Sequence, residues 1–112
     1  LLKEWVDSVL VAGWAYGPGA TALRGKGYLL AVTTGSPEDA YQAGERHGRS
    51  FDAYLPPFEQ TALLCGMHWW PPHILHGASG AGEAAIEDHV ASFRARLEAF
   101  LLTPAKENPH GA

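Results

Sequence analysis

The 112-residue sequence is poor in the groups that several protein classes require. Its single cysteine, Cys65, excludes an internal disulfide framework and a zinc site built from several cysteines. Lysines and arginines number 8 against 12 acidic residues, for a formal net charge of −4. A nucleic-acid-binding protein needs a positive field, so the charge argues against that class. No apolar run approaches the roughly 18 residues of a membrane-spanning helix.

What is present favours a folded α/β protein. Apolar residues make up 46% of the chain and charged residues 18%, which is not a disordered composition. The length fits one domain with one modest core. The sequence shows no basic, apolar signal peptide, so we expect a cytoplasmic protein in a reducing compartment.

Hydrophobic periodicity predicts three helices that alternate with two strands. The predicted elements are a helix over 1–10, a strand over 28–34, a helix over 51–66, a strand centred on 72–77 and a helix over 83–102. The first strand lacks polar alternation, so we expect it to be buried on both faces. Gly66 is expected to end the middle helix, and Asp88 and Arg96 to face outward. The alternation indicates a parallel sheet, but two strands make only part of a doubly covered one.

A candidate site follows the first predicted strand. The turn that begins with Thr33 and Thr34 lies at the carboxyl end of that strand, where open α/β sheets bind ligands. Tyr41 and His47 follow in the polar stretch 40–50, a surface loop or a short helix. A tyrosine and a histidine there can move a proton or stabilise a developing charge. The alternative is a solvated loop histidine without a chemical role.

Two aromatic residues stand in a glycine-rich loop. Trp14 and Tyr16 lie within Gly13–Ala20, which contains three glycines and a proline. One interpretation is that both rings fold back onto the edge of the core. The other is a partly exposed platform for a planar ligand.

The remaining chemistry-bearing residues favour structural interpretations. His73 and His76 point to opposite faces of a strand, and no acidic residue lies among them and His68, so we expect no metal site. Cys65 is expected to be a small buried hydrophobe. The glycine-rich segment 77–82 lacks the P-loop lysine and the full dinucleotide-binding fingerprint, so we interpret it as a flexible turn.

Four segments taken together resemble one family. They are LLKEWVD at 1–7, GWAYG at 13–17, VTTG at 32–35, and CG at 65–66 with PP at 71–72. Their order and spacing resemble the NAD(P)H:quinone oxidoreductase branch of the flavodoxin-like fold. Within that branch they resemble the ancillary flavoproteins of the Kef glutathione-regulated potassium-efflux systems. The resemblance implies that 1–102 form the C-terminal part of a three-layer α/β fold with a parallel sheet, and that 103–112 are a frayed tail.

The resemblance also implies a flavin site. In relatives, backbone amides of a Thr-Thr-Gly turn bind the isoalloxazine ring of FMN, with FAD as the alternative. Here the turn is Thr33, Thr34 and Gly35, and Ser36 completes it. Relatives continue with a second glycine, whereas this chain has Ser36-Pro37. Pro37 removes one backbone donor near that end of the flavin.

Further roles follow from the same resemblance. Tyr41 and His47 stand at the offsets of the family's tyrosine and histidine, which assist hydride transfer and stabilise the charged flavin. Trp14 and Tyr16 match aromatics that line the nicotinamide or quinone pocket, often across a dimer interface. The implied activity is a two-electron hydride transfer from NAD(P)H through the flavin to a quinone or another electrophile, by a homodimer.

Two other functions stay open. One is a regulatory subunit that activates a glutathione-gated potassium-efflux channel, held peripherally at the inner membrane by the channel. The other is an inactive fragment, because the chain opens inside a helical pattern without an initiator methionine. The family begins with βα units and a phosphate-binding loop, and two such units take at least about 60 residues. We therefore expect the isolated chain to expose an unpaired strand edge and to bind FMN weakly or not at all.

Overall fold

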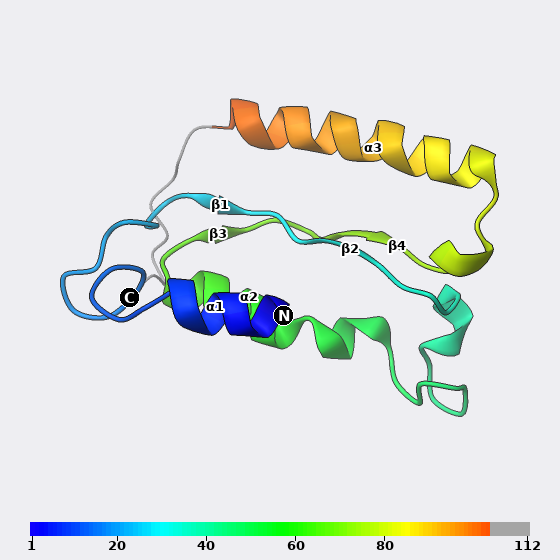
Figure 1. The fold of residues 1–112 in the computed structure, drawn as a ribbon, viewed down its shortest axis with the longest axis horizontal. Coiled ribbons are helices and arrows are strands. Elements are labelled where there is room, and N and C mark those ends of the chain that lie inside the picture. The colour runs from blue at the N-terminus through cyan, green and yellow to red at the C-terminus, as the bar shows by residue number, and fades with distance from the viewer. Residues whose placement is uncertain (104–112) are drawn as a thin grey trace. The chain divides into compact units, whose positions relative to one another are not determined.

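The computed structural model describes residues 1–103, which fall into two compact units (Figure 1). Among the described residues, the first unit comprises Leu1–Tyr28 and Phe58–Trp69, and the second comprises Leu29–Pro57 and 70–103. Each unit holds one pair of parallel strands. Within the predicted tail, only Thr103 lies among the described residues.

The strand pairs confirm the predicted parallel arrangement. They are β1 (Gly27–Tyr28) with β3 (His68–Trp69) in the first unit, and β2 (Ala31–Thr33) with β4 (His73–Leu75) in the second. The first predicted strand, over 28–34, is therefore divided into β1 and β2. The second, centred on 72–77, corresponds to β4, and β3 precedes the predicted range. Two residues separate β1 from β2 but three separate β3 from β4, and these include Pro71 and Pro72. Proline cannot donate to a ladder, so the pairing is interrupted there.

The expectation that the first strand is buried on both faces is wrong for β2. Ala31 and Thr33 are exposed and Val32 is half-buried. A two-stranded pair covers little of its own surface, and the small side chains of alanine and threonine reach few neighbours. Leu30, just before β2, is buried.

The first two helices form close to where the periodicity predicts them. Helix α1 spans Leu2–Val9, although three members of its apolar stripe, Leu2, Trp5 and Val9, are exposed. The predicted helix over 51–66 is divided into a 3-10 turn, Phe51–Tyr54, and α2, Pro56–Leu64. The division falls at Pro56-Pro57, because prolines fit the first turn of a helix but break its interior.

Gly66 ends α2 as predicted. Its backbone has φ +72°, a left-handed conformation that favours glycine. The N–H of Gly66 donates to the carbonyl of Leu63 at 3.0 Å, and the N–H of Met67 donates to the carbonyl of Ala62 at 2.8 Å. These two bonds form a Schellman motif, which satisfies carbonyls that the helix end leaves free.

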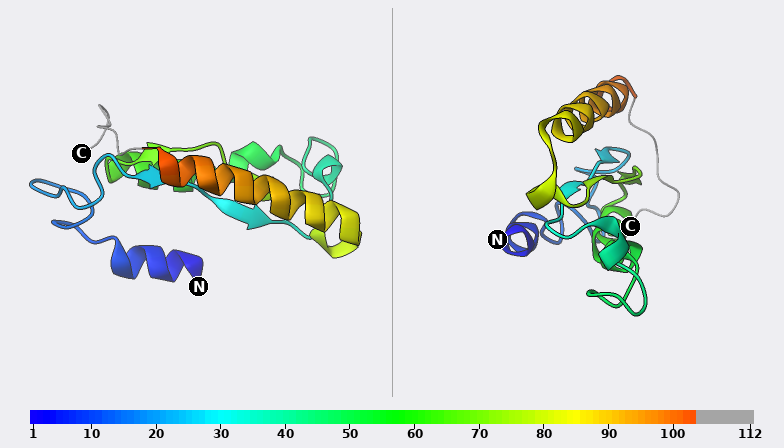
Figure 2. Two further views of the ribbon diagram at one scale, coloured as in Figure 1. Left: turned by 90° about the horizontal axis from the view of Figure 1, so that it is seen from above. Right: turned by 90° about the vertical axis from the view of Figure 1, so that its right-hand side faces the viewer.

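Helix α3 spans Glu83–Leu102, as predicted, and packs on β4 within the second unit (Figure 2). The expectation that Arg96 faces outward is wrong. Its guanidinium donates to the carbonyl of Pro72 at 2.9 Å and also to that of Pro71. The interrupted ladder leaves these carbonyls to other donors, and a guanidinium supplies five N–H groups. Asp88 is exposed.

Small residues dominate the interior. The buried apolar residues are Ala15, Ala20, Leu30, Ala62 and Cys65, and among the described residues no large side chain is fully buried. Burial raises the pKa of the Cys65 thiol above its usual value, which keeps it protonated and supports its role as a small hydrophobe. No helix in residues 1–103 combines the length and apolar character needed to cross a membrane.

The contact between β4 and α3 predicts acid sensitivity. The rings of His73 and His89 stack with centroids 4.3 Å apart, and Nη1 of Arg96 lies 3.4 Å from Nδ1 of His73. Burial, and secondarily the charge of His73, lowers the pKa of His89. The folded state therefore binds its proton less readily than the unfolded state. Stability is retained above the unfolded pKa of about 6.5 and lost as the pH falls below it.

We expect the thermal midpoint to fall between about pH 7.5 and 5.5, and the variant His89→Gln to show a flatter profile. Thermal unfolding followed by circular dichroism across this range measures both. The exposed His68 provides a matched control in His68→Gln. An unchanged pH profile in His89→Gln contradicts the prediction.

Candidate functional site

The turn after β2 is anchored by three hydrogen bonds of Thr34. Its N–H donates to the carbonyl of Leu75 at 2.9 Å, and its carbonyl accepts from the N–H of Ala78 at 2.8 Å. Its hydroxyl donates to the carbonyl of Ser36 at 2.8 Å. The turn is thereby fixed to the carboxyl end of β4 and to the 3-10 turn Ala78–Gly80.

The same turn presents backbone donors. Within the described part of the chain, the N–H groups of Gly35 and Ser36 have no hydrogen-bond partner. A Cβ added at Gly35 would lie 3.2 Å from Oγ of Ser79, so glycine provides the space here. Pro37 has no N–H to add. Two adjacent donors on an exposed turn fit the acceptor-rich edge of a planar ring such as a flavin.

Tyr41 and His47 lie together beside this turn. A 3-10 turn, Glu38–Ala40, leads into Tyr41, and the N–H of His47 returns to the carbonyl of Ala40 at 3.0 Å. The two rings stack with centroids 4.3 Å apart and planes 16° apart. A hydrogen bond of 2.8 Å joins Nε2 of His47 to Oγ of Ser36. Local turn structure therefore connects the predicted pair to the predicted cofactor turn.

Tyr41 is the centre of an aromatic cluster that we define as Tyr41, His47, Phe51, Tyr54 and His76. The rings of Phe51 and Tyr54 meet Tyr41 edge-on at 5.2 and 6.1 Å, and the ring of His76 lies 5.4 Å away. Nδ1 of His76 also lies 3.0 Å from Oγ1 of Thr34. Neither Phe51 nor His76 was expected in the site. One feature of the sequence could have indicated His76: like Thr34, it directly follows a parallel strand, where ligand-binding residues lie in open α/β sheets.

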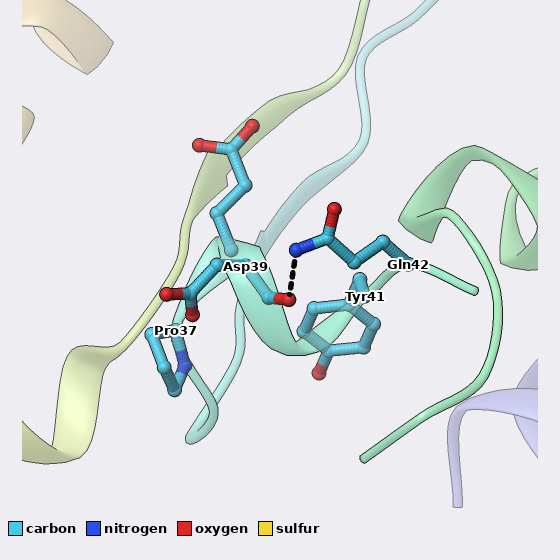
Figure 3. Close-up of a pocket in the computed structure, with 5 residues that line it drawn as sticks. Pro37, Asp39, Tyr41 and Gln42 are labelled. Atoms are coloured by element: carbon cyan, nitrogen blue, oxygen red, sulfur yellow. Dashed lines mark hydrogen bonds between the residues drawn. The ribbon is translucent and has the colours of Figure 1, made fainter. Parts of the chain in front are cut away.

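An open pocket of about 590 Å³ adjoins the cluster. It is lined by Pro37, Glu38, Asp39, Tyr41 and Gln42 (Figure 3). Nε2 of Gln42 donates to the carbonyl of Asp39 at 2.8 Å, and this bond links the two ends of the segment 39–42. The pocket combines an aromatic ring with two acidic side chains.

The other two candidate residues belong to the first unit. There the N–H of Gly13 donates to the carbonyl of Tyr16 at 2.7 Å. Trp14 is 46% exposed and Tyr16 is half-buried. Their part in a substrate pocket stays a prediction.

His73 and His76 contact different parts of the second unit, in line with the expectation that they point to opposite faces. His73 stacks on His89 of α3, whereas His76 contacts Tyr41. Residues 1–103 contain no group of three or more side chains arranged to hold a metal ion.

Comparison with known proteins connects this geometry to a family. Residues 1–100 match the family described as having a flavodoxin-like fold. The glutathione-regulated potassium-efflux system ancillary protein KefF of Salmonella newport (strain SL254) is 42% identical over 100 residues, which are 89% of this chain and 56% of KefF.

Three solved structures are similar. An NADPH-quinone reductase from P. pentosaceus has a TM-score of 0.76 and 27% identity, with 85% of this chain and 56% of that chain covered. General stress protein 14 from Treponema denticola, in complex with FMN, gives 0.70 and 39%, with 88% and 55% covered. A protein described as a thermophilic tryptophan halogenase from Streptomycin violaceusniger gives 0.78 and 38%, with 92% and 58% covered.

The chain therefore spans little more than half the length of these relatives. The names of these relatives describe different activities. The fold is what the relatives share with this chain. The parallel strands and the match over 1–100 confirm the resemblance identified from the sequence. The chain belongs to the flavodoxin-like family.

Proposed function

We propose that the chain supplies the ring-side half of the active site of a flavin-dependent NAD(P)H:quinone oxidoreductase. The observation that carries the proposal is the bond of 2.8 Å between Nε2 of His47 and Oγ of Ser36, with Tyr41 stacked on the imidazole. The FMN complex of general stress protein 14 and the NADPH-quinone reductase among the relatives support it. When bound, the flavin supplies the two-electron chemistry.

Each part of the site has a task in this proposal. Thr33, Thr34, Gly35 and Ser36 hold the flavin ring, with FMN preferred and FAD as the alternative, through backbone donors such as the N–H groups of Gly35 and Ser36. Hydride transfer moves negative charge within the site, and donors aimed at that charge lower the barrier. The Tyr41 hydroxyl and the His47 imidazole are the groups that can hold or move a proton there.

The proposal also gives a role to two residues of the first unit. We propose that Trp14 and Tyr16 line the pocket that takes the nicotinamide and then a quinone or another electrophile. An exposed indole offers a flat apolar surface for such planar rings, and Trp14 is 46% exposed. We also propose that the active form is a homodimer located in the cytoplasm.

The isolated 112-residue chain is expected to bind FMN weakly or not at all. A net hydrogen bond contributes about 0.5–1.5 kcal/mol, whereas micromolar affinity requires about 8 kcal/mol. A few ring-side donors therefore fall short without further contacts to the phosphate end. Flavin fluorescence during titration with FMN measures this. Saturable one-to-one binding near or below about 1 μM would show that 112 residues suffice.

Replacement of His47 in the natural gene product tests its role. We expect His47→Gln to lower kcat for NAD(P)H-dependent quinone reduction by about 100-fold or more, because an amide keeps a donor but cannot be protonated. FMN content, read from visible absorbance, should stay unchanged. His68→Gln, at an exposed position of β3, is the matched control. Unchanged turnover in His47→Gln removes His47 from the mechanism.

A second candidate function is regulation of a potassium-efflux channel. The 42% identity with KefF, an ancillary protein of such a system, favours it. We propose that the gene product docks on the cytoplasmic part of a channel and is held at the inner membrane through it. Docking and turnover can coexist, because activation of a channel need not consume substrate.

A pull-down with the channel's purified cytoplasmic domain tests this second function. We expect recovery of the complex with both the unmodified protein and His47→Gln, since the substituted ring is half-buried against Tyr41 rather than on a docking surface. Recovery of neither protein counts against the channel partner and leaves the oxidoreductase proposal to its own test.

A further inference from the structure

We propose that His76 is a positioning residue that holds both the flavin-binding turn and the Tyr41 ring; this rests on the proposed oxidoreductase function. His76 is absent from the predicted site, yet it contacts both parts of it. Nδ1 lies 3.0 Å from Oγ1 of Thr34, and its ring lies 5.4 Å from that of Tyr41 and 4.9 Å from that of Phe51.

Strand register brings His76 to the turn. β2 and β4 pair in parallel with Thr33 opposite Leu75. Thr34 directly follows β2 and His76 directly follows β4, so both lie at the same end of the parallel pair. A histidine at this one position therefore reaches a threonine hydroxyl that is 42 residues away in sequence.

The hydrogen bonds of Thr34 fix the proton on His76. A threonine hydroxyl has one proton to donate, and Oγ1 donates it to the carbonyl of Ser36 at 2.8 Å. In its contact with His76 the oxygen must therefore accept, so Nδ1 carries a proton. Both the Nδ1-protonated neutral ring and the imidazolium have that proton.

The resulting chain of donors ends where the predicted catalytic pair begins. His76 donates to Thr34, and Thr34 donates to the Ser36 carbonyl, which also accepts from the N–H of Gly77 at 2.8 Å. Both lone pairs of that carbonyl are thus used. These bonds fix the backbone of Ser36, while its side chain makes the hydrogen bond with His47. The His76 ring also packs against the Tyr41 ring, with the two planes tilted by 43°.

Two substitutions separate these two contacts in the natural gene product. His76→Phe keeps a ring against Tyr41 and Phe51 but removes the Nδ1 donor. We expect it to raise the FMN dissociation constant about 3- to 10-fold and to lower kcat at saturating FMN less than His76→Asn does. His76→Asn keeps an N–H donor near the Nδ1 position but removes the ring. We expect near-normal FMN affinity and a lower kcat, because Tyr41 loses a packing partner.

A double-mutant cycle tests whether the bond to Thr34 carries the effect. Thr34→Val removes the hydroxyl at nearly constant shape, and with it the bonds to both His76 and the Ser36 carbonyl, so we expect it to weaken FMN binding at least as much as His76→Phe. The double variant should then bind FMN no more weakly than Thr34→Val alone. His68→Phe is the matched control and should change neither quantity. Multiplicative losses in the double variant, or equal losses of affinity and kcat in both His76 variants, overturn the proposal.

The tautomer of His76 provides a measurement without flavin or turnover. Nitrogen-15 NMR of the unmodified gene product should show His76 protonated on Nδ1 at neutral pH, and an Nε2-protonated neutral ring overturns the proposal even if no variant folds. Failure of the oxidoreductase function has a different signature. In that case the coupling in FMN affinity persists, while NAD(P)H does not reduce quinones.

Discussion

The site depends on the parallel pairing of β2 with β4. This register places Thr34 beside the end of β4, where its N–H bonds the carbonyl of Leu75 and its carbonyl accepts from Ala78. A shift of this register by one residue would move Thr34 about 3.3 Å along β4, which would break both hydrogen bonds. The turn then could not present the donors of Gly35 and Ser36 on one side. A few backbone bonds of this short pair therefore determine where ligand-binding groups lie.

Aromatic packing fixes the conformation of the loop that follows the turn. Tyr41 contacts four other rings, with centroid separations from 4.3 to 6.1 Å. Rings at these separations attract through offset and edge contacts, so a polar loop without a buried apolar face still holds a defined shape. Residues 42–46 are all exposed, so burial does not hold this segment in place. Tyr41 is thereby held on several sides while its pocket stays open.

Local signals explain what the sequence predicted well. The ends of α3 and the Gly66 stop of α2 depend on neighbours within a few residues, and both were predicted. Tyr41 and His47 were identified as a pair, and the loop geometry brings them together. What the sequence did not reveal depends on distant partners. Periodicity cannot show that the carbonyls of Pro71 and Pro72 accept from Arg96, and it gives no register from which His76 could be placed beside Thr34.

The candidate site lies within the second unit. The turn, the aromatic cluster and the hydrogen bonds that join them all belong to the second unit. Their geometry is set by contacts among residues 29–57 and 70–103, because the partners given above for Thr34 and Tyr41 lie there. The orientation of the Tyr41 and His47 rings is therefore a property of one compact unit. Affinity for a whole flavin nucleotide and enclosure of a substrate require contacts beyond it, since a ring-side turn alone provides few bonds.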